Sequence, residues 1–216
     1  MTSGYGPRRV IAVGSSAGGI EALSALLATA TVGHDECFVV AQHLSPTDSS
    51  VLPELLARVT PLQVITASDG AELVPDVVYV APPAVDMTVD GDVLRVDPVG
   101  ELGPPWPSID RLFTSVGLTR GVDAVAILLS GTGDDGAAGV ESVHSAGGLV
   151  AVQDPASASF SGMPGAAIAT GTPDLVLPVR EILPELARVL DPRDARRSDP
   201  PDSALSMDDS ALEAVI

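Results

Sequence analysis

The sequence contains no lysine, a single cysteine and few aromatic residues. Each shortage excludes some classes of structure or binding partner. One cysteine, Cys37, excludes a disulfide within the chain and is typical of a reducing compartment. With 3% aromatic but 45% hydrophobic residues, the core must consist of Val, Leu, Ile and Ala. Pro, Gly and charged residues interrupt every long apolar run, and the first nine residues contain no signal-peptide core. We therefore expect a soluble, cytoplasmic chain with no direct insertion into a membrane.

Positive charge is scarce as well. The chain has 29 acidic residues and 11 basic ones, all of them arginine, which gives a formal net charge of −18 at pH 7. This charge repels phosphate groups, so it argues against nucleic acid and anionic membranes as partners. We expect neither a metal ion nor an organic cofactor.

Apolar, strand-like segments alternate with helical patterns along most of the chain. This alternation predicts an α/β fold, a doubly wound and mainly parallel sheet with helices on both faces. An Asp-Gly turn within 87–96, flanked by alternating apolar residues, predicts an added antiparallel hairpin. The expected strands are 9–13, 37–41, 62–66, 77–80, 124–129, 149–152 and 175–177, and the expected helices are 20–28, 51–59, 109–116 capped by Ser108, 137–145, 163–169 and 180–190.

The composition changes at Asp191. Residues 1–190 carry the alternating pattern and are expected to form one domain, which at this length has room for a full core. Residues 191–216 begin with a run rich in Pro, Asp and Arg, which predicts an acidic, disordered C-terminal tail.

Residues 14–18, Gly-Ser-Ser-Ala-Gly, lie between the first expected strand and the first expected helix. They fit the G-x-S-x-G nucleophile elbow, in which small neighbours let the chain bend sharply and expose the middle serine. The helix start adds free N–H groups and a positive dipole end, which suit an oxyanion or a phosphate. A nucleophilic serine and an ordinary phosphate-binding loop both fit this segment.

Two further strand ends carry groups that complete a hydrolytic site. His43 follows the strand 37–41, and Asp134 and Asp135 follow the strand 124–129. Ligands of open α/β sheets bind beyond the carboxyl ends of the strands, so we expect these groups to converge there with the serine. Hydroxyl, imidazole and carboxylate then form a serine-hydrolase triad. Taken singly, each of these residues is better explained as a helix cap or a polar turn residue. Their occurrence together at one edge of the sheet favours the triad.

At these residues the sequence resembles the catalytic domain of the CheB family, the chemotaxis protein-glutamate methylesterases. The resemblance runs from about Val10 to Leu190 and rests on five motifs in the same order: GSSAGG at 14–19, QHLSP at 42–46, SID at 108–110, SGTGDDG at 130–136 and GMP at 162–164. The first two motifs are most similar to the branch in which the esterase is fused to a receptor methyltransferase. The resemblance implies Ser16 as nucleophile, His43 as base and Asp135 as the orienting carboxylate. It also implies an oxyanion site formed by backbone N–H groups near Ala17 and Thr132.

The resemblance further implies hydrolysis of glutamate γ-methyl esters on the cytoplasmic helices of a chemoreceptor or similar signalling protein, with release of methanol. Some members of the family also deamidate receptor glutamine. The implied partners are the methylated receptor and a separate receptor methyltransferase or response regulator. Family members usually begin with a phosphorylatable receiver domain, whereas only about nine residues precede the first expected strand here. We therefore expect a free-standing methylesterase domain that is active without phosphorylation.

Two other interpretations stay open at this point. A catalytically silent interaction module of a chemotaxis-like signalling system fits the same motifs, because a triad in sequence need not be aligned in space. A phosphate or dinucleotide site is weakened because residues 14–19 lack the G-x-G-x-x-G spacing. Reactivity of the serine toward a fluorophosphonate probe separates an esterase from both.

Overall fold

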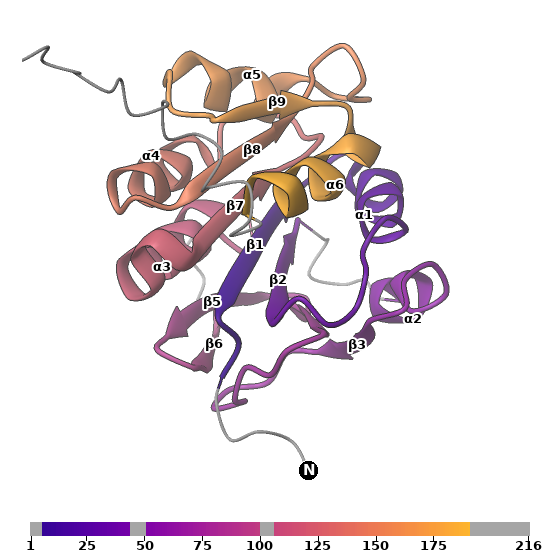
Figure 1. The fold of residues 1–216 in the computed structure, drawn as a ribbon, viewed down its shortest axis with the longest axis vertical. Coiled ribbons are helices and arrows are strands. Elements are labelled where there is room, and N and C mark those ends of the chain that lie inside the picture. The colour runs from indigo at the N-terminus through magenta and orange to yellow at the C-terminus, as the bar shows by residue number, and fades with distance from the viewer. Residues whose placement is uncertain (1–5, 44–50, 100–105, 191–216) are drawn as a thin grey trace, which may run out of the picture. The chain divides into compact units, whose positions relative to one another are not determined.

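A computed structural model describes residues 6–43, 51–99 and 106–190 of the chain (Figure 1). Strands and helices alternate along these residues, as the sequence predicts. The strands are β1 (Arg9–Ser15), β2 (Glu36–Gln42), β3 (Gln63–Thr66), β4 (Val77–Val80), β5 (Val85–Asp90), β6 (Val93–Pro98), β7 (Ala124–Leu128), β8 (Leu149–Gln153) and β9 (Leu175–Leu177). The α-helices are α1 (Gly19–Leu27), α2 (Leu52–Leu56), α3 (Ile109–Arg120), α4 (Ala137–Ser145), α5 (Gly162–Ala169) and α6 (Val179–Leu190).

Seven of the strands form one parallel sheet in the order β3-β4-β2-β1-β7-β8-β9. The middle strands β1, β2 and β7 are apolar through their centres, with polar residues only at the ends of β1 and β2, and β1 and β7 are buried at every position. Continuous apolar runs of this kind suit parallel strands that helices cover on both faces. The strands β5 and β6 pair separately as an antiparallel hairpin. The expected α/β fold with an added hairpin is confirmed.

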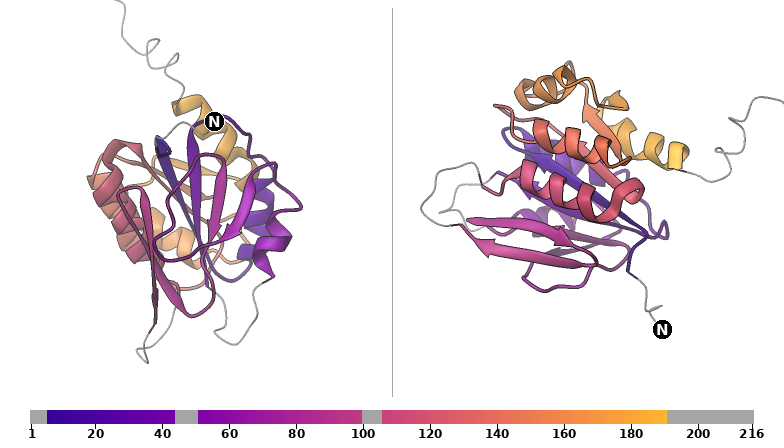
Figure 2. Two further views of the ribbon diagram at one scale, coloured as in Figure 1. Left: turned by 90° about the horizontal axis from the view of Figure 1, so that it is seen from below. Right: turned by 90° about the vertical axis from the view of Figure 1, so that its left-hand side faces the viewer.

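Side chains that alternate along each strand divide the interior into two sides. Val10 and Ala12 of β1 belong to a cluster that also contains residues of α3, α4, α5 and the hairpin. Helices α1 and α2 lie on the opposite side of the sheet from α3 and α4 (Figures 1 and 2). The sheet is therefore covered on both faces, as a doubly wound fold requires.

The chain changes direction across the sheet at β1. From β1 it passes to β2 on one side, whereas β7 pairs with β1 on the other side. Such a reversal of strand order is where open α/β sheets bind ligands, beyond the carboxyl ends of the strands. The segments that follow β1, β2 and β7 meet at this point, and they contain the serine, histidine and aspartate motifs of the sequence.

Two helices differ in length from their expected bounds. Helix α2 covers only Leu52–Leu56, whereas α3 continues past Gly117 to Arg120. A side chain at Gly117 would come within 3.1 Å of the backbone of Val143 in α4, so the glycine permits close packing of α3 on α4. The helix instead ends at Gly121, whose φ of 55° is left-handed.

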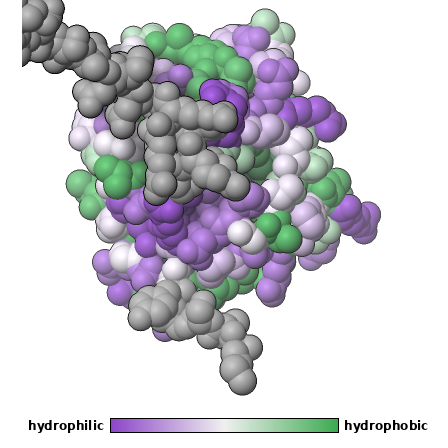
Figure 3. Space-filling model, viewed as in Figure 1, coloured by the Kyte–Doolittle hydropathy of each residue, from purple (hydrophilic) through white to green (hydrophobic). Residues whose placement is uncertain are grey.

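Among the described residues, those up to Pro184 form one compact unit, and residues from Glu185 onward are set apart from it. The expected boundary after residue 190 stays a prediction, because the tail 191–216 lies outside the described residues. The face drawn in Figure 3 is mostly hydrophilic, with hydrophobic residues in separate groups. Among the described helices, none is both long enough and apolar enough to cross a bilayer.

Candidate active site

The turn between β1 and α1 is shaped by small residues. Gly18 precedes α1 with a φ of 69°, a left-handed conformation that favours glycine. A side chain there would also come within 2.8 Å of Ser159 and 2.9 Å of the Ser130 hydroxyl. Ser130 supports the turn, because its hydroxyl donates to the Ala17 carbonyl at 2.8 Å and its own carbonyl accepts from the Ser16 N–H at 3.0 Å. The sharp bend expected of a nucleophile elbow is thus built from contacts between the ends of β1 and β7.

The two serines of the turn have different surroundings. Ser15 is completely buried, and its hydroxyl donates to Gln42 Oε1 at 2.6 Å. Ser16, one residue further, is partly exposed. A nucleophile must reach substrate, so the burial of Ser15 favours Ser16 for that role.

Gln42 joins the ends of β1 and β2. Besides accepting from Ser15, its side-chain amide donates to the carbonyls of Ser16 and His43, both at 2.9 Å. The His43 N–H in turn donates to the Ser15 carbonyl at 3.0 Å. These four hydrogen bonds fix the backbone of Ser16 relative to that of His43.

The imidazole of His43 contacts the carboxylate of Asp135. His43 Nε2 lies 2.9 Å from Asp135 Oδ2, and the two side chains are only 13% and 12% exposed. Two N–H groups at the start of α3 also donate to this carboxylate, from Ile109 to Oδ2 and from Asp110 to Oδ1, each at 2.9 Å. Burial raises the pKa of the Asp135 carboxyl, but the hydrogen bonds from His43, Ile109 and Asp110 outweigh it and leave the pKa below its ordinary value. Asp135 is therefore held as a carboxylate.

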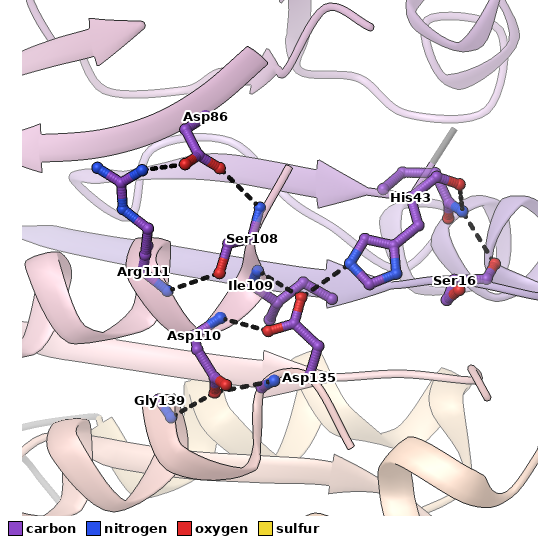
Figure 4. Close-up of polar contacts among 11 residues, drawn as sticks. Ser16, His43, Asp86, Ser108, Ile109, Asp110, Arg111, Asp135 and Gly139 are labelled. Atoms are coloured by element: carbon purple, nitrogen blue, oxygen red, sulfur yellow. Dashed lines mark hydrogen bonds and ion pairs between the residues drawn. The ribbon is translucent and has the colours of Figure 1, made fainter. Parts of the chain in front are cut away.

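Figure 4 shows His43 between Asp135 and Ser16. Nε2 points to the carboxylate, and the other ring nitrogen, Nδ1, lies on the side of Ser16 (Figure 4). With its proton on Nε2, the imidazole donates to Asp135 and keeps Nδ1 free as a proton acceptor. The order serine, imidazole, carboxylate is the geometric order of a hydrolytic triad.

The two N–H groups expected to form an oxyanion site belong to residues that directly follow Ser16 and Gly131 in the chain. Within the described part of the chain, neither the Ala17 N–H nor the Thr132 N–H donates a hydrogen bond. The two segments lie close together, because a side chain at Gly131 would come within 2.9 Å of the Ser16 Cβ. Unpaired N–H groups beside a nucleophile are the requirement for an oxyanion hole.

The structure brings the predicted residues Ser16, His43 and Asp135 to one edge of the sheet, while Asp134 is exposed beside them. Their roles stay predictions, as do those of Ala17 and Thr132. Residues 44–46 of the QHLSP motif lie outside the described residues. The described residues contain no group of three or more His, Cys, Asp or Glu side chains suited to a metal ion.

Sequence reasoning missed two supporting residues, Gln42 and Asp110. Both belong to motifs that carry the family resemblance, yet the partners of their side chains lie 26 to 29 residues away in sequence, apart from the adjacent His43 carbonyl. The local sequence gives each residue only one signal. Gln42 is a polar residue directly after the expected strand 37–41, and Asp110 is a carboxylate in the first turn of a helix.

Comparisons with known proteins identify relatives of this chain. The family model described as CheB methylesterase matches residues 11–186. A protein-glutamate methylesterase/protein-glutamine glutaminase of Myxococcus xanthus is 37% identical over 185 residues, which is 84% of this chain and 54% of that protein. An uncharacterized 104.1 kDa protein of Rhodobacter capsulatus is 46% identical over 139 residues, 64% of this chain and 14% of its own length.

The fold agrees as well. The crystal structure of the Thermotoga maritima CheB methylesterase catalytic domain matches with a TM-score of 0.76 and 26% identity, over 86% of this chain and 100% of that one. This chain spans about half the length, or less, of the Myxococcus and Rhodobacter relatives. On the family match and these relatives, the chain belongs to the CheB methylesterase family.

Proposed function

We propose that this chain hydrolyses glutamate γ-methyl esters on a signalling protein and releases methanol. The observation that carries the proposal is the contact of His43 Nε2 with Asp135 Oδ2 at 2.9 Å, with Nδ1 on the side of Ser16. Support also comes from the names of relatives such as the Myxococcus and Hahella proteins, which are protein-glutamate methylesterases.

In the first half of the reaction, Ser16 Oγ attacks the ester carbonyl carbon while His43 Nδ1 takes the hydroxyl proton. The Asp135 carboxylate stabilises the imidazolium that forms, and the Ala17 and Thr132 N–H groups donate to the oxyanion. Collapse of the tetrahedral intermediate breaks the bond to the methoxy oxygen, which leaves as methanol with the proton from His43. The product of this half is a glutamyl ester of Ser16.

In the second half, water repeats the sequence. His43 takes a proton from water, the hydroxide adds to the acyl carbon, and Ser16 leaves with that proton. Glutamate is released as a carboxylic acid that ionises in water. The same steps applied to the side-chain amide of glutamine would release ammonia, an activity that the glutaminase part of the relatives' names supports.

The substrate of this proposal is a methylated chemoreceptor or a similar signalling protein, on its cytoplasmic part. The carboxylate product does not return to the methyl ester by itself. The proposal therefore requires a separate methyltransferase that restores the ester. The alternative function is an interaction module without catalysis. The contact of His43 with Asp135 favours catalysis, and no contact among the described residues favours the interaction module.

Two measurements test the proposal. Purified protein is treated with a fluorophosphonate probe, and methanol release is measured from a receptor cytoplasmic fragment carrying labelled methyl esters. We expect labelling at Ser16 and release of labelled methanol, both lost in Ser16→Ala. A protein that neither reacts with the probe nor releases methanol is an interaction module instead.

A further inference from the structure

Helices α3 and α4 begin beside each other, and each start is held by an aspartate from the other segment. Asp135, two residues before α4, accepts from the first two N–H groups of α3, those of Ile109 and Asp110. Asp110 in turn accepts from two N–H groups at the start of α4, those of Gly136 at 2.9 Å and Gly139 at 2.7 Å. Figure 4 shows this reciprocal arrangement beside His43.

Helix α4 depends on this outside acceptor. Its N-cap residue is Gly136, which has no side chain to receive the free N–H groups of the first turn. The Asp110 carboxylate takes the place of an ordinary Ser, Thr or Asp cap. Removal of that carboxylate leaves the N–H groups of Gly136 and Gly139 without their acceptor.

Asp110 controls the position of Asp135 in two ways. Its side chain holds the N–H of Gly136, the residue that follows Asp135, and its own N–H donates to Asp135 Oδ1. The carboxylate and the adjoining backbone of Asp135 are therefore both tied to one residue. The oxygen that contacts His43, Oδ2, belongs to the carboxylate so fixed.

The charge of Asp110 lies beside that of Asp135. Burial raises the pKa of the Asp110 carboxyl, the hydrogen bonds from Gly139 and Gly136 lower it, and the negative charge of Asp135 raises it again. Both hydrogen bonds from α4 go to a single oxygen, Oδ1. The amide oxygen of an asparagine can accept the same two hydrogen bonds. Asp110→Asn therefore keeps the cap of α4 and removes only the negative charge.

We infer that Asp110 is a positioning residue for the proposed hydrolysis: it holds Asp135 in place for His43 and adds a second negative charge behind it. The inference rests on the proposed function for its kinetic part only. The other charged and titratable groups near Asp110 and Asp135 are His43 after β2, the exposed Asp134, and the ion pair of Arg111 in α3 with Asp86 in β5.

The kinetic test compares Asp110→Ala with Asp110→Asn in the full chain, on the methylated receptor fragment. We expect Asp110→Ala to lower kcat by about 10- to 100-fold with little change in KM, since misplacement by about 1 Å costs on this order. Asp110→Asn keeps the acceptor oxygen and should restore kcat to within a few-fold. Asp174→Ala is the matched control. Asp174 also accepts a hydrogen bond from a backbone N–H, that of Val150 at 2.8 Å, but Val150 lies near the start of β8, at the end of the sheet away from the site.

A second readout does not depend on activity. The pKa of His43 is followed by NMR in the wild-type protein and in Asp110→Asn. Loss of a nearby negative charge destabilises the imidazolium, so the variant should titrate at lower pH, and the acid limb of its pH–rate profile should move the same way. An unmoved His43 titration overturns the inference, even where Asp110→Ala does not fold. So does a kcat loss in Asp110→Ala no greater than in Asp174→Ala. An inactive wild-type protein contradicts the proposed function alone.

Discussion

Ser15 and Ser16 are adjacent in sequence but differ in what they contact, and this difference allows a clean test of the nucleophile. Ser16→Ala removes the proposed attacking oxygen and should lower kcat on the order of 10⁶-fold, as in other serine hydrolases. Ser15→Ala should keep most of the turnover. It leaves Gln42 Oε1 without its buried donor, so it should lower the free energy of unfolding by about 1–3 kcal/mol.

Turnover and urea unfolding of both variants check this prediction. The expected result is a crossed pattern, with activity lost in one variant and stability lost in the other. Comparable losses of activity in both serine variants would contradict the assignment of Ser16.

Asp134 and Asp135 are a second adjacent pair with unequal roles. Asp135→Asn disturbs the tautomer of His43 and should lower kcat by up to about 10⁴-fold, whereas Asp134→Asn changes an exposed residue and should have little effect. The measurement is kcat for each variant against wild type. Equal small effects would remove Asp135 from the proposed triad.

The lowered pKa of Asp135 adds a dependence on pH. Because the folded-state pKa lies below the ordinary value of 3.8, the charged carboxylate stabilises the folded protein above that pH. This contribution is lost as the pH falls through the folded-state pKa. The difference in unfolding free energy between wild type and Asp135→Asn should therefore shrink as the pH falls below about 3.8. A difference that grows as the pH falls below 3.8 would contradict the direction of the shift.

The hairpin of β5 and β6 is joined to the start of α3 by Asp86. This buried carboxylate accepts from the Ser108 N–H at 3.0 Å and pairs with the Arg111 guanidinium. Asp86→Ala leaves the Ser108 N–H without its acceptor, and we expect a loss of about 1–3 kcal/mol in unfolding free energy, measured in urea. The start of α3 also holds Asp135, so kcat should fall as well.

Asp90 on the same strand is the matched control for this element. It pairs with Arg95, but the two side chains are 67% and 49% exposed, and exposed pairs contribute about 0–1 kcal/mol. Asp90→Ala should therefore leave both stability and kcat nearly unchanged. A loss in Asp90→Ala equal to that in Asp86→Ala would show that the hairpin has no specific tie to the site.

At the scale of the whole molecule, the sequence predicted what local patterns can encode. The apolar runs of β1 and β7, the Asp-Gly turn of the hairpin and the Ser108 cap are signals within a few neighbouring residues, and the structure confirms each. The bridge through Gln42 and the exchange of caps between Asp110 and Asp135 join residues 25 to 29 positions apart. No local pattern specifies such partners, because they depend on how strand ends meet in the folded sheet.

The net charge of −18 is a property of the whole molecule with a measurable cost. Like charges repel in the compact state, and salt screens them, with a Debye length of about 10 Å at 0.1 M and 3 Å at 1 M. We expect the midpoint of thermal unfolding to rise between 0.1 and 1 M NaCl. A midpoint that is constant or falls would show that self-repulsion is negligible.

A charge-reduced variant separates screening from general effects of salt on burial. Glu72, Asp97 and Glu141 are exposed, and none has a side-chain hydrogen bond or ion pair among the described residues. Converting these three carboxylates to amides changes the formal net charge from −18 to −15. If repulsion is the cause, the variant should be more stable than wild type at 0.1 M NaCl and should gain less from added salt. Equal gains in both proteins would assign the effect to salt acting on apolar burial, which the substitutions leave unchanged.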